Sequence, residues 1–130
     1  MSQTLQIAKA TAIHIVDAIE PSLQLWVEQL GWRVVVDVPD GDRLGFVLLQ
    51  RDSAELMLQT RRSLAGDLPK VAALSPSSIL YLDVNDLALA ERAVAGAELL
   101  VPPRKTFYGA HELFIRDPAG HVIGFSHHPR

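Results

Sequence analysis

Cysteine is absent from the 130 residues of this chain. Its absence excludes disulfide bonds, thiolate nucleophiles and zinc sites with cysteine ligands. No apolar run approaches the roughly 18 residues of a membrane span, and the N-terminus lacks the basic and then apolar pattern of a signal peptide. We therefore expect a cytoplasmic protein that does not bind or cross a membrane.

An excess of basic residues is also missing, since 12 Lys and Arg stand against 15 Asp and Glu and the net charge is −3. Nucleic acid is therefore not expected as a partner, because its binding proteins usually present a basic face. The chain also lacks a Gly-x-Ser-x-Gly motif, a phosphate-binding loop and a dinucleotide fingerprint. These absences exclude the enzyme classes that such motifs mark.

What the chain does contain is a faint internal repeat. Gly31 and Gly96 each precede an apolar run, and Arg51-Asp52 and Arg116-Asp117 each end one, with the two copies half a chain length apart. A repeat of this length is a whole supersecondary unit. The sequence therefore predicts a single domain over residues 1–130 that is built from two similar modules.

Each module is predicted to contain a strand, a helix and three further strands. The helices start at Pro21 and at Asn85 or Asp86, and Gly31 and Gly96 end them. Apolar runs rich in β-branched residues predict the strands. Module one, about 8–60, has strands over 10–17, 32–38, 44–50 and 54–59, a linker follows over 61–77, and module two, about 78–127, has strands over 78–84, 97–101, 110–116 and 121–127.

Two segments resemble the vicinal oxygen chelate superfamily, which includes glyoxalase I, extradiol dioxygenases, fosfomycin-modifying enzymes and bleomycin-binding proteins. Residues 25–32 (LWVEQLGW) resemble its aromatic-rich helix end, and residues 116–125 (RDPAGHVIGF) resemble its hairpin into the last strand. The resemblance covers roughly residues 10–126. It implies an α+β fold in which two βαβββ modules form an open cup, and often a homodimer, which we also expect from the apolar composition.

The resemblance also implies where a metal would bind. Metal-dependent members place one His, Glu or Gln on each of four strands, and a divalent ion needs several such donors at one point. Glu55 falls on one of these positions. The other three fall on Thr11 (or Ala10), Ile79 (or Ser78) and Gly124. We therefore predict a member without a metal or other cofactor.

Histidine is the main alternative source of ligands. His14 either points into the cup or packs under the first helix, and the sequence leaves both orientations open. His111, on the third strand of module two, is a candidate for the cup. Together with Glu55 and His14, it would make a metal site that departs from the pattern of the family.

Aromatic residues are only 6% of the chain, so their positions are informative. Several gather in module two, where they would supply apolar walls with polar tips to a small-molecule pocket. Glu55 is either a hydrogen-bond acceptor or base for a ligand, or an acid paired with a nearby cation. The predicted ligand-binding residues are Glu55, Tyr81, Phe107, Tyr108, His111 and Phe114.

Three hypotheses follow for function. The first is a metal-independent protein that binds a small molecule, similar to bleomycin-binding resistance proteins, with no catalytic residues assigned. The alternative is a metal-dependent lyase, isomerase or dioxygenase that uses Glu55 with off-pattern histidines. The third is a structural dimer whose cup is filled by its own side chains. The sequence names no ligand, because a fold hosts many functions.

Overall fold

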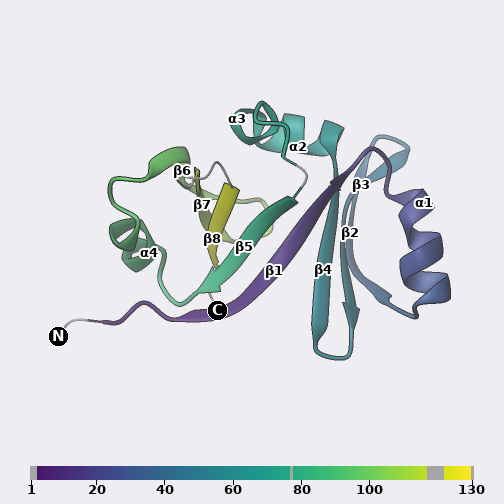
Figure 1. The fold of residues 1–130 in the computed structure, drawn as a ribbon, viewed down its shortest axis with the longest axis horizontal. Coiled ribbons are helices and arrows are strands. Elements are labelled where there is room, and N and C mark those ends of the chain that lie inside the picture. Colours follow the sequence, from purple (N-terminus) through teal and green to yellow (C-terminus); the bar gives the residue numbers. More distant parts are fainter. Residues whose placement is uncertain (1–2, 77, 117–121, 130) are drawn as a thin grey trace. The chain divides into compact units, whose positions relative to one another are not determined.

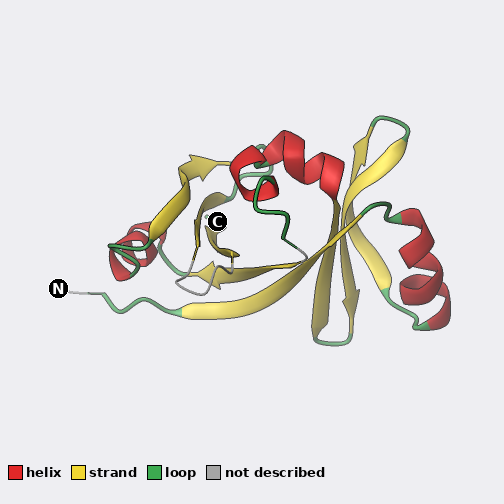
Figure 2. Cartoon of the chain, turned by 45° about the horizontal axis from the view of Figure 1, so that its top comes forward, coloured by secondary structure: helices red, strands yellow, loops and turns green. Residues whose placement is uncertain are grey.

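The computed structural model of the chain describes residues 3–76, 78–116 and 122–129. Two compact units are present, and strands β1 (Ile7–Val16) and β5 (Ser78–Val84) each contribute residues to both. The N-terminal unit holds residues 12–78, and the C-terminal unit holds residues 1–11 with 79–130. Figures 1 and 2 show the strands and helices of each unit.

The N-terminal unit is a four-stranded sheet in the order β2-β3-β4-β1. Strands β2 (Arg33–Asp40), β3 (Arg43–Arg51) and β4 (Ala54–Thr60) are antiparallel, and β1 pairs in parallel with β4. The connection from β1 to β2 is a helical segment, α1 (Glu20–Leu23) and the π-helical η1 (Gln24–Gln29), which lies beside the sheet in Figure 1. This helical connection carries the chain from β1 at one end of the strand order to β2 at the other end, and β3 and β4 then return it to the side of β1.

One face of this sheet is buried beneath that helical segment. Its apolar core consists of Ile19, Val47, Leu49, Leu56 and Leu58, with Trp26 and Trp32 packed against it. The two tryptophan rings meet edge to face, with their centroids 5.1 Å apart. The residues alternate along β3 and β4, so the intervening side chains lie on the opposite face of the sheet.

The C-terminal unit repeats this plan in the order β5-β8-β7-β6. Strand β8 (Val122–His127) pairs in parallel with β5 and antiparallel with β7 (His111–Arg116), which pairs with β6 (Glu98–Lys105). Helix α4 (Leu87–Ala93) begins at Asp86, whose Oδ1 accepts hydrogen bonds from the amides of Ala88 and Leu89 at 2.8 and 3.3 Å. This carboxylate caps donors that the first helical turn leaves without partners.

The apolar side of this second sheet faces α4. Its buried members are Val84, Ala90, Leu113, Ile115 and Phe125. The N-terminal residues join the same unit through Asn85. Its side-chain Oδ1 accepts a hydrogen bond from the backbone amide of Gln6 at 2.8 Å, and its backbone amide donates to the backbone carbonyl of Gln6 at 3.2 Å. The predicted α+β fold of two βαβββ modules is therefore confirmed.

The predicted end of the first helix agrees with the structure better than that of the second. Gly31 has a φ of 73° and directly follows the C-cap Leu30. Gly96 also has a positive φ, of 93°, but α4 ends at Ala93, three residues before it. The first helix differs from the regular α-helix that we predicted, because the Leu30 amide bonds the Leu25 carbonyl five residues back, at 2.9 Å. Strand β5 has the predicted bounds.

Two regions differ from the sequence-based prediction. The predicted linker over 61–77 contains two short helices, α2 (Arg61–Asp67) and α3 (Pro69–Ala72). Thr60 caps α2 by accepting from the Ser63 amide at 3.0 Å, and Leu64 and Val71 are buried, so this segment is packed rather than extended. Strand β6 also continues through Pro102-Pro103 to Lys105, beyond the predicted end at residue 101. It lies at the edge of its unit's sheet and shifts register there, where prolines cost little.

Candidate functional site

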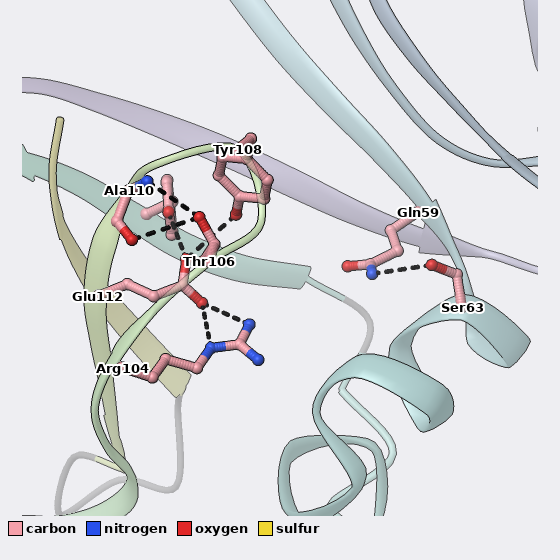
Figure 3. A network of polar contacts seen from close by, with 8 residues as sticks. Gln59, Ser63, Arg104, Thr106, Tyr108, Ala110 and Glu112 are labelled. Carbon is pink, nitrogen blue, oxygen red and sulfur yellow. Dashed lines mark hydrogen bonds and ion pairs between the residues drawn. The ribbon is translucent and has the colours of Figure 1, made fainter.

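A buried carboxylate lies in the middle of the C-terminal unit. Glu112 is 1% exposed, and it is the single carboxylate among the buried polar residues that the structure describes. Arg104 donates to Glu112 Oε2 from Nε at 3.0 Å and from Nη2 at 2.6 Å. The hydroxyls of Tyr81 and Tyr108 donate to Oε1 at 2.7 and 3.2 Å. Figure 3 shows Arg104 and Tyr108 beside the Glu112 carboxylate.

Strand alternation explains why these side chains meet. Leu113 and Phe125 point toward α4, so their neighbours Glu112 and Ser126, which are paired across β7 and β8, lie on the other face. Tyr81 on β5 is paired with Gly124 of β8, and Arg104 on β6 is paired with Glu112. Four adjacent strands therefore bring one carboxylate, one guanidinium and two hydroxyls to the same face.

Tyr108 reaches Glu112 from the short loop between β6 and β7. The loop is closed at its base, where Thr106 and Ala110 exchange backbone and side-chain hydrogen bonds of 2.8–3.3 Å. Gly109 supplies a φ of 87°, a conformation that favours glycine. The loop holds Tyr108 54% exposed and Phe107 83% exposed, with the two rings edge to face at 5.0 Å.

The electrostatics of this cluster keep both phenols protonated. Burial raises the pKa of Tyr81 well above its ordinary value, and the nearby Glu112 charge raises it further. The same two causes, in the same order, raise the pKa of Tyr108 to about 12. Glu112, in turn, accepts four hydrogen bonds, so its two oxygens are largely occupied by donors of this chain.

Gly124 leaves room for two aromatic rings that pack beside this cluster. A Cβ atom at position 124 would lie 2.6 Å from Phe114 Cε2 and 2.9 Å from Tyr81 Cδ1. The two rings lie 6.0 Å apart and are 2% and 8% exposed. Any side chain at position 124 would therefore have to displace one or both buried rings.

The chain was compared with models of known protein families. Residues 9–125 match the model of the glyoxalase/bleomycin resistance protein/dioxygenase superfamily. The chain belongs to this superfamily. No curated protein sequence matches the chain.

Solved structures agree with the superfamily assignment at the level of the fold. A superfamily member from Vibrio splendidus is 19% identical with a TM-score of 0.70, and 94% of this chain aligns with 99% of it. Methylmalonyl-CoA epimerase from Mycobacterium tuberculosis is 20% identical with a TM-score of 0.71 and coverages of 100% and 94%. An NAD-dependent benzaldehyde dehydrogenase from Legionella pneumophila is 13% identical with a TM-score of 0.68 and coverages of 93% and 100%. At such identities the likeness shows the fold alone.

The positions at which metal-dependent superfamily members hold their ion do not fit a metal in this chain. Ile79 is buried and apolar, and the space beside Gly124 is filled by the rings of Phe114 and Tyr81. Thr11 is buried and offers only a hydroxyl. Glu55 alone carries a strong donor, and the described residues contain no group of three or more His, Asp or Glu side chains that could hold an ion.

Glu55 belongs to the N-terminal unit and accepts a hydrogen bond from a neighbouring strand. It is half-buried on β4, and its Oε1 accepts from Gln50 Nε2 of β3 at 3.0 Å. Gln59, two residues further along β4, donates to Ser63 at 3.2 Å (Figure 3). His14 is exposed on β1, on the face of Ala12 and Val16, which pack against the helix-side core. His14 therefore lies on the helix-side face and not on the opposite face, but it is exposed and is not packed under the helix.

Three of the predicted ligand-binding residues come together, namely Tyr81, Tyr108 and Phe114. Phe107 contacts the ring of Tyr108. His111 is exposed, on the face of Leu113 and not of Glu112. That each of these residues binds a ligand, Glu55 included, stays a prediction.

The sequence reasoning missed Glu112, Arg104 and Ser126. Glu112 could have been found from the sequence. It precedes the apolar run Leu113-Phe114-Ile115, just as Glu55 precedes Leu56-Met57-Leu58, and an acid in such a strand is unusual. A carboxylate that is followed by a run of apolar residues in a strand predicts a buried carboxylate with a partner.

Proposed function

We propose that this chain is a metal-independent protein that binds a small, partly apolar molecule, as bleomycin-binding members of the superfamily do. The observation that carries the proposal is the saturated Glu112. A carboxylate with four donors, beside phenols held in their neutral form, is built to present fixed hydrogen-bonding groups rather than to move protons. The paired aromatic rings of the same unit supply apolar surface.

The metal half of this proposal is tested on protein purified without chelators. We expect no stoichiometric transition metal by elemental analysis, and no rise in melting temperature on adding nickel, zinc, manganese or iron. A bound ion would stabilise the fold by about 2.7 kcal/mol at a hundredfold excess over its dissociation constant, which is a shift of several degrees. One equivalent of metal that is lost on changing Glu55→Ala would instead support the lyase, isomerase or dioxygenase alternative.

The binding half is tested by a melting-temperature screen of neutral, anionic and cationic aromatic compounds. A compound that raises the melting temperature in wild-type protein, and less in Arg104→Met, supports a pocket at the Glu112 cluster. A screen in which no compound shifts the transition would favour the structural-dimer hypothesis.

Assembly and location stay predictions. None of the helices in the described ranges has the length and apolar character to cross a membrane. We propose a homodimer in the cytoplasm. Sedimentation at micromolar concentration tests the assembly, because a lone 14.3 kDa species would remove it.

A further inference from the structure

Tyr108 is the member of the Glu112 cluster that is easiest to displace. Its hydrogen bond to Glu112 Oε1 is 3.2 Å long, against 2.7 Å for Tyr81 and 2.6 and 3.0 Å for Arg104. Its side chain is 54% exposed, whereas Tyr81 is 8% exposed and is fixed on a strand. A longer hydrogen bond from a half-exposed loop residue contributes least to stability, because water competes for it.

Displacing Tyr108 would leave Glu112 with room to accept a hydrogen bond from another hydroxyl. Glu112 Oε1 would still accept a hydrogen bond from the Tyr81 hydroxyl, but it would lose the one from Tyr108. On the adjacent strand, the buried Ser126 Oγ makes no hydrogen bond of standard geometry within the part of the chain that the structure describes, although it lies close enough to the Tyr81 hydroxyl to lower the pKa of that phenol. Ser126 is paired with Glu112 across β7 and β8, so both side chains lie on one face. A ligand hydroxyl would satisfy both groups by donating to Glu112 and accepting from Ser126.

The charges around this position select a neutral group. A ligand anion would meet the Glu112 carboxylate at close range, and a ligand cation would meet the Arg104 guanidinium that already pairs with it at 2.6 Å. The ring of Phe107, 83% exposed at the same loop, offers an aromatic surface to whatever approaches. These features together favour an aromatic ring that carries an uncharged hydroxyl.

We propose that the phenol of Tyr108 occupies the place of a ligand hydroxyl, and that the chain binds neutral phenols by exchanging Tyr108 for the ligand at Glu112. This inference rests on the proposed small-molecule binding and names its chemical class. Tyr108 is then an internal competitor, which lowers the apparent affinity and keeps the buried carboxylate satisfied while no ligand is bound.

The test compares three probes that differ in one group: p-cresol, 4-methylanisole, which cannot donate, and 4-methylbenzoate, which is anionic. Dissociation constants are measured by titration calorimetry and ligand-observed NMR for wild type, Tyr108→Phe and Phe107→Leu. We expect p-cresol to bind wild type at least tenfold more tightly than either other probe. Tyr108→Phe should strengthen p-cresol binding about fivefold, because it removes the competing donor.

Phe107→Leu is the matched control, since it changes the same loop but leaves the Tyr108 hydroxyl in place. It should weaken p-cresol binding or leave it unchanged. If both variants bind p-cresol more tightly by the same factor, the loop has been loosened and the exchange is wrong. The exchange is also wrong if Tyr108→Phe binds p-cresol with unchanged affinity, or if the wild type binds 4-methylanisole as tightly as p-cresol. If other compounds shift the melting temperature while p-cresol binds neither wild type nor Tyr108→Phe, the exchange is wrong and the proposed function stands.

Discussion

Substitution of Gly124 by alanine tests the packing that closes the superfamily's metal position. The new Cβ would approach Phe114 and Tyr81 within 2.6–2.9 Å, closer than real Cβ atoms approach other groups. Both rings are buried, so neither can move without disturbing its neighbours. Overpacking of this kind costs about 1–3 kcal/mol. The lower entropy of the unfolded alanine chain returns about 0.4–1 kcal/mol, so we expect a net loss of about 1–2 kcal/mol.

For a chain of this size, such a loss lowers the melting temperature by about 4–8 °C. Thermal unfolding followed by circular dichroism measures it. Gly66→Ala is the matched control, because its Cβ would meet nothing within 4 Å and Gly66 lies in helix α2, where alanine is favoured by about 1 kcal/mol. If Gly124→Ala is as stable as wild type while Gly66→Ala is stabilised, the rings do not fill the position and the exclusion of a metal ligand there is wrong.

Two further predictions concern the Glu112 cluster. Arg104→Met should lower the free energy of unfolding by about 3 kcal/mol at pH 7, because it leaves the 2%-exposed Glu112 side chain without its cation. Denaturant unfolding measures the change, and an unchanged transition would show that the hydrogen bonds from the two tyrosines are enough to stabilise the carboxylate. The pKa values of Tyr81 and Tyr108 are raised on folding, so the folded chain holds protons that the unfolded chain releases above pH 10, and stability should fall as pH rises from about 10 toward 12. With only two tyrosines in the chain, ultraviolet titration reads them directly, and ionisation of both at pH 10 in folded protein would contradict the assigned burial.

The elements of the fold were predictable because their signals are local. Gly31 follows the end of the first helical segment with a positive φ, and Asp86 caps α4 with a side-chain oxygen. Both depend on a few neighbouring residues that the sequence displays. The two short helices α2 and α3 were missed because Gly66 and Pro69 read as loop residues, whereas burial of Leu64 and Val71 decides the structure there.

The candidate site was only partly predictable, because it depends on pairings that the sequence does not display. Tyr81 and Glu112 are 31 residues apart in the chain, and they meet because β5 and β7 both flank β8. Arg104 follows two prolines that locally indicate the end of a strand, yet the edge position of β6 lets the strand continue far enough to place the guanidinium at Glu112. Neither contact follows from local propensity.

The packing around position 124 is coupled across four strands, β5 to β8. Glycine at this position offers no side-chain ligand, and it opens the space into which the Phe114 and Tyr81 rings pack. Tyr81 then stands where its hydroxyl donates to Glu112 at 2.7 Å, and that buried carboxylate requires the cation that Arg104 supplies. We therefore expect that Gly124→Glu alone would not create a metal site, because the added carboxylate would meet two rings and a second acid rather than an ion.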